Sequence, residues 1–415
     1  MVSESNWAGN YTFRASRIHR PSRLEEARKL VANAPRIRGI GARHSFHDIA
    51  DSAEIISLEI IEPGIEIDPD AMTATASASL PYGDFAAAVH GAGYALHNMG
   101  SLPHISIGGA TATATHGSGS TNGNLSSAVS ALEFITSEGD TLRVTRSEAD
   151  FSGMVVHLGA LGLVTRVTFD IQPTFEVSQE VLDDLPWEPL LECFTEIFSS
   201  AYSVSVFTTF GHDRAGSLWR KHRHSEGGLR SEETWGATPA NEARHPVRGF
   251  ASDPCTTQLM QAGPWCDRLP HFRIGAVPSA GQEIQVEYMI DIDHASEAVR
   301  ALRAFEPRLR DVLIVSELRT IAADDLWLST AYGRDSLAIH FTCHRDQAKI
   351  DALLPDLESL LEPFSPRPHW GKVFSANAET LASRYPKYGD FRQLRQQLDP
   401  RGAFINPFME RVGLA

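Results

Sequence analysis

The chain is poor in cysteine and in positive charge, and it contains no long apolar run. Its four cysteines, Cys193, Cys255, Cys266 and Cys343, form no Cys-x-x-Cys pair. The absence of such a pair excludes a disulfide framework and a zinc ribbon. We expect each cysteine to be a small, buried hydrophobic side chain. Lys and Arg total 37 against 52 Asp and Glu, so a net charge of −15 would repel nucleic-acid phosphates and anionic lipid head groups.

Membrane-spanning and secretory segments are lacking as well. No apolar run reaches the roughly 18 residues that cross a bilayer. Residues 1–11 are polar and contain no apolar core before a small-residue cleavage site. We therefore expect a cytoplasmic protein that binds neither nucleic acid nor membranes. We also predict a monomer.

The composition that remains is that of a globular protein. The 415 residues are 42% hydrophobic and 21% charged, and this length predicts two or three domains. Ser22 and Glu25 have capping-box spacing, so we expect a helix from near Ser22 to Pro35, followed by a strand over 36–40. The patterns predict further strands over 72–80, 164–171, 204–210, 283–290, 313–321 and 337–343, a hairpin of 132–136 with 141–144, and helices over 81–91, 295–305 and 351–361.

This pattern predicts an α+β protein with a domain boundary at Pro173. Residues 216–270 show no clear period, and we expect them to be irregular.

The stretch 101–120 has almost no bulky side chain and no formally charged one. Small side chains let a ligand approach the backbone, and successive N–H groups with Ser and Thr hydroxyls can bind a pyrophosphate without lysine. We therefore predict a phosphate-binding loop, with a flexible linker as the alternative. Gly117, Gly119 and Gly123 miss the spacing of a Rossmann fingerprint, which excludes that motif.

Two turns present a single functional side chain each. The glycine turn 39–46 follows the first strand and carries His44, and Lys372 follows Trp370 and Gly371. A histidine in a loop is usually a hydrogen-bonding residue, and a lysine in a turn is usually exposed, so each turn alone is a weak indication of catalysis.

Polar side chains alternate along two strands of the second half. His340, Thr342 and His344 share one face of their strand, opposite an apolar face. Glu317 and Arg319 lie about 7 Å apart along one face of theirs. Such faces can bind a polar ligand, although a solvated sheet face with a paired Glu and Arg explains the second pattern better on periodicity alone.

Together these motifs resemble the vanillyl-alcohol-oxidase superfamily of FAD enzymes, and within it the alditol (xylitol) oxidase family. The resemblance runs from Asn6–Asn10 to Leu398–Asn406. It implies a two-domain, PCMH-type FAD-binding fold of the α+β class. Residues 1–173 and 371–415 would form the FAD-binding domain, and 174–370 an inserted, sheet-containing substrate domain.

The resemblance also implies which residues bind the cofactor FAD. His44 matches a histidine that is bonded covalently to the flavin ring, whereas Arg43 replaces the small residue common before it. No metal is implied. The residues implied to line the FAD, besides His44, are Gly39, Ile40, Gly41, Ala42, Arg43, Ser45, Ser101, Ser106, Gly109, Ala110, Thr111, Ala112, Leu163 and His369.

By the same resemblance, a polyol and O2 are the small-molecule partners. The positions that match polyol-contacting residues are Ser101, Glu317, Arg319, Thr342 and Lys372, with His340 beside them. The implied reaction oxidises the terminal primary alcohol of xylitol or sorbitol to the aldose by hydride transfer to flavin N5, with O2 reduced to hydrogen peroxide.

Lys372, Arg319 and His340 are the implied catalytic residues. Arg319 and Lys372 would stabilise the developing alkoxide, and Lys372 could instead lose its proton and act as the base. Gly100 matches a position near the flavin where a small residue is associated with access for O2.

Three other functions compete with this interpretation. An aldonolactone-type sugar-lactone oxidoreductase would share the fold. A metal-dependent hydrolase could use His44, His47, His340 and His344, but these lack a ligand spacing such as His-Glu-x-x-His. A carbohydrate-binding protein that has lost catalysis is disfavoured because all five substrate positions are filled.

Overall fold

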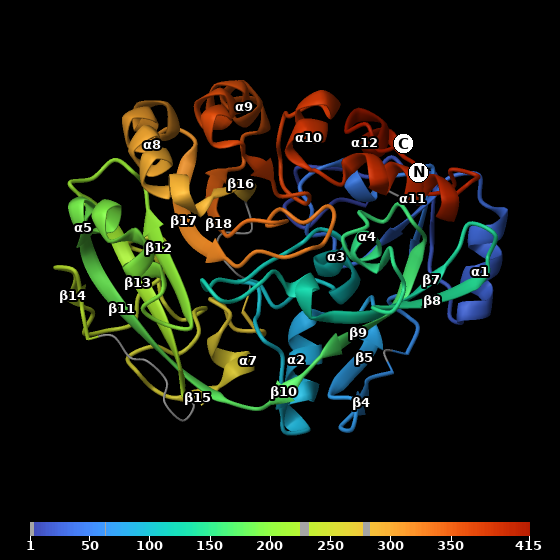
Figure 1. Ribbon diagram of the computed structural model, residues 1–415, viewed down its shortest axis with the longest axis horizontal. Coiled ribbons are helices and arrows are strands. Elements are labelled where there is room, and N and C mark those ends of the chain that lie inside the picture. The colour runs from blue at the N-terminus through green and yellow to red at the C-terminus, as the bar shows by residue number, and fades with distance from the viewer. Residues whose placement is uncertain (1–3, 63, 225–231, 277–282) are drawn as a thin grey trace.

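The computed structural model describes residues 4–62, 64–224, 232–276 and 283–415. Two sheet-containing regions lie side by side, the N-terminal one in blue and cyan and the other, formed mainly by the middle of the chain, in green to orange (Figure 1). The last helices, in red, lie with the N-terminal region. Among the helices of the described segments, none is long and apolar enough to cross a membrane.

A small parallel sheet opens the chain. Its strands are β1 Arg17–His19, β3 Glu54–Ser57 and β2 Ile37–Ile40, in that spatial order, and helix α1 Leu24–Asn33 connects β1 to β2. The strand and helix predicted here are confirmed, but the capping box is wrong. Arg23 is the N-cap, and the Ser22 backbone N–H donates to Glu26 Oε2 (3.0 Å), one residue beyond the expected partner Glu25.

The second sheet of the N-terminal region has five antiparallel strands. Their order is β4 Glu66–Asp68, β5 Thr73–Ser77, β9 Leu163–Asp170, β7 Val129–Ile135 and β8 Thr141–Thr145. The predicted hairpin is confirmed, because β7 pairs with β8 from Ala131 with Thr145 to Ile135 with Thr141. Helix α2 Tyr82–Gly91 and the short α3 Ile107–Ala112 complete this region, and the pair β6 Tyr94–Ala95 with β10 Gln172–Pro173 borders it.

A nine-stranded sheet forms the second region. Its order is β14 Thr238–Pro239, β11 Glu176–Pro186, β13 Arg214–His224, β12 Ser203–Thr208, β17 Leu313–Ile321, β18 Ser336–His344, β16 Glu283–Asp291 and β19 Arg367–Pro368, with β15 Gly263–Pro264 paired to β11. Helices α8 Ala295–Leu309 and α9 Gln347–Leu361 lie along one side of it (Figure 1). The four strands and two helices expected here are all present.

The expectation that 216–270 is irregular is wrong for its first part. Residues 214–224 form β13, a strand of the sheet interior that pairs with both β11 and β12. Its polar residues hide it from a hydrophobic-period search, because Arg220, Lys221 and His222 are buried in spite of their charge or polarity. Residues 225–231 of the same expectation lie outside the described residues.

The C-terminal segment is bonded to the first sheet. The backbone N–H of Ile37 donates to Ala403 O (2.8 Å), and Asn406 Nδ2 donates to three carbonyls of the 48–51 turn. This segment carries α10 Ala378–Arg384, α11 Tyr388–Leu398 and α12 Pro407–Arg411. The remaining helices are α4 Phe151–Val155, α5 Trp187–Glu192, α6 Phe194–Phe198 and α7 Trp265–Arg268, with 3-10 turns at Asp48–Ala50, Leu125–Ala128, Ile292–His294 and Glu362–Phe364.

Candidate active site

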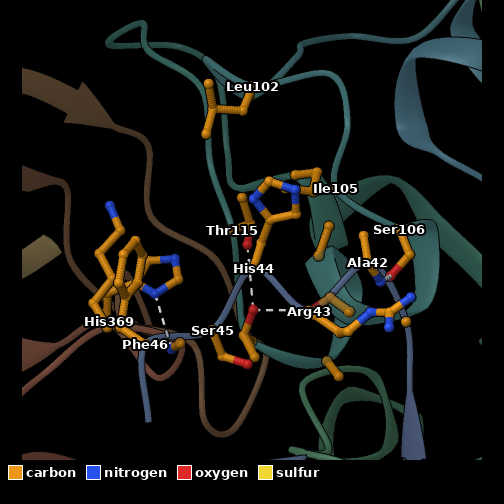
Figure 2. Close-up of a pocket in the computed structure, with 18 of the residues that line it drawn as sticks. Ala42, Arg43, His44, Ser45, Phe46, Leu102, Ile105, Ser106, Thr115 and His369 are labelled. Atoms are coloured by element: carbon orange, nitrogen blue, oxygen red, sulfur yellow. Dashed lines mark hydrogen bonds between the residues drawn. The ribbon is translucent and has the colours of Figure 1, made fainter. Parts of the chain in front are cut away.

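A cavity lies between the glycine turn 39–46, the small-residue stretch around α3, and strands β16, β17 and β18. It is therefore lined by both sheet regions. Figure 2 shows His44, Ser106 and His369 on its wall. The stretch 101–120 is folded and packed, with Ile107 and Ala114 fully buried, so the flexible-linker alternative is wrong.

The structure places nearly all of the predicted cofactor residues on this cavity. Those that line it are Gly39, Ile40, Gly41, Ala42, Arg43, His44, Ser45, Ser101, Ser106, Gly109, Ala110, Ala112, Leu163 and His369. Thr111 is the exception, because it does not line the cavity. The helical turn of α3 buries its side chain, and its carbonyl accepts a hydrogen bond from Ser126 Oγ (2.9 Å).

The glycine turn 39–46 fits tightly against the small-residue stretch and against strand β9. A Cβ at Gly41 would lie 2.1 Å from Ser106 Oγ, and one at Gly39 would lie 2.7 Å from Leu163 Cδ1. The Ala42 backbone N–H donates to Ser106 Oγ (3.3 Å). The wall is thus built from backbone and small side chains, which matches what a dinucleotide cofactor such as FAD requires of a binding loop.

His44 is presented to the cavity from the turn with its aromatic face covered. Its ring stacks on Trp7, with centroids 5.0 Å apart and planes inclined by 23°. Burial, with the nearby charge of His104 as a smaller cause, lowers the pKa of His44 to about 4. The imidazole is therefore neutral at neutral pH and keeps a nitrogen lone pair.

Three adjacent strands supply the opposite wall. The register places Glu287 of β16 and Glu317 of β17 on either side of His340 of β18. Because side chains alternate, the polar residues of the three strands that face the cavity are Glu283, Gln285, Glu287, Glu317, Arg319, His340 and Thr342. His344, predicted to share the face of His340, is exposed and does not line the cavity.

Glu287 lies at the centre of the charged cluster. Its carboxylate accepts from Arg319 Nη2 (2.8 Å) and Lys372 Nζ (2.5 Å), and it lies 3.3 Å from His116 Nε2 and 3.6 Å from His340 Nδ1. Burial alone would raise the pKa of Glu287, but the charges of Lys372, His116 and Arg319 lower it well below its usual value. Glu287 is therefore ionised and is the shared partner of the two cations.

Lys372 is a donor at both of its polar contacts. Its Nζ lies 2.5 Å from Glu287 Oε2 and 2.7 Å from His340 Nδ1. Burial lowers the pKa of Lys372, whereas Glu287 raises it. Burial likewise lowers the pKa of His340 to about 4, with Lys372 as the next cause. A charged Lys372 beside a neutral His340 satisfies both contacts.

A second pair lies next to the cluster. Glu317 accepts from His271 Nε2 (2.9 Å) and lies 3.5 Å from Arg319 Nε. Burial raises the pKa of Glu317, but Arg319 and His271 outweigh it and lower the pKa far below the usual value. Arg319 Nη1 also donates to Ser101 Oγ (3.2 Å), which connects the strand wall to the small-residue stretch.

Sequence reasoning missed three residues of this site: Glu287, His116 and His271. The signal for Glu287 was present, because Glu283, Gln285 and Glu287 alternate in an otherwise apolar strand, as Glu317 and Arg319 do in theirs. His116 lies within the stretch 101–120, which the sequence predicts to bind phosphate. No sequence signal marked His271, because its role depends on contact with β17.

The four histidines of the metal-dependent hydrolase alternative do not come together in one metal site. His47 is stacked on Phe408 (4.8 Å), whereas His344 is exposed. Within the described residues there is no group of three or more His, Cys, Asp or Glu side chains that could hold a metal ion.

Comparison with known proteins places these features in one group of flavoenzymes. A family model described as an FAD binding domain matches residues 15–145, and one described as D-arabinono-1,4-lactone oxidase matches residues 279–412. An alditol oxidase from a Streptomyces species is 41% identical over 98% of this chain and 97% of its own. An L-gulono-1,4-lactone dehydrogenase from Mycobacterium tuberculosis is 28% identical, with 98% of each chain covered.

Solved structures of low sequence identity share the fold. The crystal structure of cholesterol oxidase from B. sterolicum superimposes with a TM-score of 0.80 at 13% identity, covering 99% of this chain and 96% of that one.

Proposed function

This chain belongs to the alditol oxidase family of the vanillyl-alcohol-oxidase superfamily, and on that premise we propose that it oxidises the terminal primary alcohol of an alditol such as xylitol or sorbitol, with FAD as cofactor. The observation that carries the proposal is the cluster of Glu287, Arg319 and Lys372 on the cavity that His44 also lines. Bound there, FAD supplies the hydride acceptor, and O2 takes up the electrons as hydrogen peroxide.

The side chains on the strand wall suit an uncharged, hydroxyl-rich substrate. Both cations of the cluster, Arg319 and Lys372, already contact a carboxylate of Glu287 or Glu317. A buried site of this kind offers fixed donors and acceptors to hydroxyl groups and leaves neither cation without a partner for an anionic ligand to bind. Ser101 and Thr342 add hydroxyls on the same cavity.

Each catalytic residue has a separate task in this proposal. Arg319 and the ammonium of Lys372 stabilise the alkoxide that forms as the substrate loses its hydroxyl proton. Nδ1 of neutral His340 accepts from Lys372, so the proton reaches His340 through Lys372, which passes one proton to Nδ1 as it receives the hydroxyl proton and stays an ammonium. Glu287 touches both cations and His340, and it holds them in position.

His44 is the proposed site of covalent attachment to FAD. Its ring lines the cavity, and its lowered pKa leaves a neutral nitrogen nucleophile. The residues proposed to hold FAD are the fourteen that line the cavity from the predicted set, among them Gly41, Ser106 and His369. Gly100 also lines the cavity, and we propose that its small size admits O2.

The division into an FAD-binding domain of 1–173 with 371–415 and a substrate domain of 174–370 is part of the same proposal. The arrangement of the sheets supports this division. Strands β11 to β19 all belong to the nine-stranded sheet, and the C-terminal segment is hydrogen-bonded to the parallel sheet of β1, β3 and β2. A cytoplasmic location and a monomeric state remain predictions, which fractionation of the producing cells and light scattering would test.

The visible spectrum during anaerobic addition of xylitol tests the function. We expect a yellow protein that bleaches as the flavin is reduced, and that recovers its colour when O2 is admitted with formation of peroxide. A yellow protein that no alditol bleaches would contradict the proposal.

A sugar lactone is the second candidate substrate, because the family model that matches 279–412 is that of a lactone oxidase. Bleaching by an aldono-1,4-lactone in the absence of bleaching by xylitol would favour it.

A further inference from the structure

The segment Glu4–Asn10, which we call the N-terminal clamp, is bonded to the turn that carries His44. The backbone N–H of Trp7 donates to Arg43 O (2.9 Å). Asn6 Nδ2 donates to Ser45 O (2.9 Å), and Asn10 Nδ2 donates to Phe46 O (2.9 Å). Three donors of the clamp thus satisfy the carbonyls on both sides of His44.

Asn6 is the fixed point of the clamp. It is 4% exposed, and its Nδ2 also donates to Asn10 Oδ1 (2.7 Å). Its Oδ1 accepts from the Tyr11 backbone N–H (3.1 Å), and its own N–H donates to Tyr11 O (2.9 Å). With its amide and its backbone N–H in use, Asn6 has little freedom to turn.

Trp7 fixes the ring of His44 itself. The stacked contact at 5.0 Å covers one face of the imidazole. Within the described residues, no hydrogen bond holds either ring nitrogen of His44, so stacking and the backbone bonds set the direction of the ring. His44 itself lines the cavity.

The backbone of Arg43 adopts an unfavourable conformation that contacts with the N-terminal clamp stabilise. Its φ is +62°, a left-handed conformation that arginine rarely adopts. The Trp7 bond to its carbonyl and the ion pair of its guanidinium with Glu4 hold that conformation, with Glu59 at 3.7 Å as a further partner. Arg43, which stands where the family commonly has a small residue, is therefore itself bonded to the N-terminal clamp.

We propose that Asn6 and Trp7 are positioning residues for His44 and that they set the rate at which FAD becomes covalently attached. The inference rests on the covalent attachment proposed above. Forming that bond joins a His44 ring nitrogen to a ring-methyl carbon of the flavin. The imidazole N–H and one methyl C–H give up two protons and two electrons, and O2 accepts them as hydrogen peroxide.

The experiment compares four full-length variants with the wild type. Trp7→Leu removes the stacked ring, Trp7→Phe retains an aromatic ring, and Asn6→Ala removes the donor to Ser45. Tyr11→Phe is the matched control, because it removes a hydrogen bond of the same chain region to Asp51 (2.6 Å) without touching the turn. Circular dichroism establishes that each variant is folded.

Each protein is incubated with FAD in air, and samples are denatured at intervals. The flavin that remains with the protein is measured by gel fluorescence and by intact mass, neither of which depends on turnover. We expect Trp7→Leu and Asn6→Ala to attach FAD about fivefold to tenfold more slowly than wild type, as loss of one aromatic or hydrogen-bonded contact predicts. Trp7→Phe and Tyr11→Phe should attach it at nearly the wild-type rate.

Attachment at the wild-type rate in both Trp7→Leu and Asn6→Ala would overturn the positioning role and leave the covalent bond intact. Release of all FAD by the denatured wild type would overturn the covalent bond and the positioning role together. Bleaching of the same preparations by xylitol tests the alditol oxidase activity separately from both.

Discussion

Replacing Glu287 by glutamine removes one buried negative charge and keeps the shape of the side chain. The carboxylate lies 2.5 Å from Lys372 Nζ and 2.8 Å from Arg319 Nη2, so the variant leaves both cations without their shared partner. At an effective dielectric constant of about 20, a pair about 4 Å apart interacts by about 4 kcal/mol. That energy corresponds to about three pKa units.

The sign of the effect follows from which form the carboxylate stabilises. Glu287 raises the pKa of Lys372, so its removal lets burial lower that pKa further. If Lys372 acts as a cation, flavin reduction slows as the pH rises through its pKa. This alkaline decline should therefore begin about two to three pH units lower in Glu287→Gln than in wild type.

The assay is stopped-flow reduction of the flavin by xylitol without oxygen, from about pH 5 to about pH 10. Glu358→Gln is the matched control, because Glu358 is a carboxylate that accepts from Tyr288 Oη (2.6 Å) beside the same strand and does not line the cavity. An alkaline decline at the same pH in Glu287→Gln and wild type would refute the reasoning. A rate that instead rises through the pKa of Lys372 would show that Lys372 is the base.

Folding stability gives a second readout of the same substitution. The pKa of folded Glu287 lies well below the ordinary carboxyl value of 4.5. The stability that this charge contributes is therefore complete above that value, and it is lost as the pH falls toward the folded-state pKa. The difference in melting temperature between wild type and Glu287→Gln should shrink only in acid.

Four further outcomes are expected. Lys372→Met should retain flavin but slow its reduction by roughly 10² or more, measured by the same stopped-flow assay, because a charge partner of the alkoxide is lost; near-normal reduction would remove Lys372 from the mechanism. His44→Ala should release its flavin on denaturation, and flavin still held covalently would contradict the attachment site. Gly100→Ala should fold, because the added Cβ would lie 3.5 Å from the nearest side chain, and should slow reoxidation by O2; unchanged reoxidation would exclude the O2 role. Arg38→Met should lower the free energy of unfolding by about 3 kcal/mol in a denaturant titration, because buried Arg38 donates to four backbone carbonyls; a loss near zero would show that water replaces these bonds.

The regular elements were predictable where the period was regular. The hairpin of β7 and β8 and the strands β16, β17 and β18 follow from apolar alternation and turn residues. Strand β13 was missed because Lys221, whose Nζ donates to Leu269 O and Pro270 O, is buried among backbone carbonyls. The sequence around Lys221 does not reveal these hydrogen bonds, because the carbonyls that offset the burial of the ammonium come from residues about 50 positions away.

The candidate site was predictable to a similar extent. Strand periodicity marked Glu317 and Arg319, a turn marked Lys372, and the family resemblance assigned all three to the site; the structure brings them onto one cavity. Glu287 and His271 were not found, because a buried Glu or His looks the same in sequence whether it pairs within the core or lines a site. The resemblance gives the position of Thr111 in the chain but not the side of α3 on which it lies, and in the structure Thr111 does not line the cavity.

The sequence by itself determined the elements, the two glycine segments and the chemical types at the site, because these depend on local period, backbone freedom and the identity of single side chains. Only the tertiary structure decided which charges share a partner. Glu287 meets Lys372 across 85 residues of chain, and Trp7 covers His44 through a segment with no regular secondary structure. Such contacts form because the order of the strands and the path of the chain bring distant segments together. They set the burial and the charges around each side chain, and the reactivity of the site follows from these.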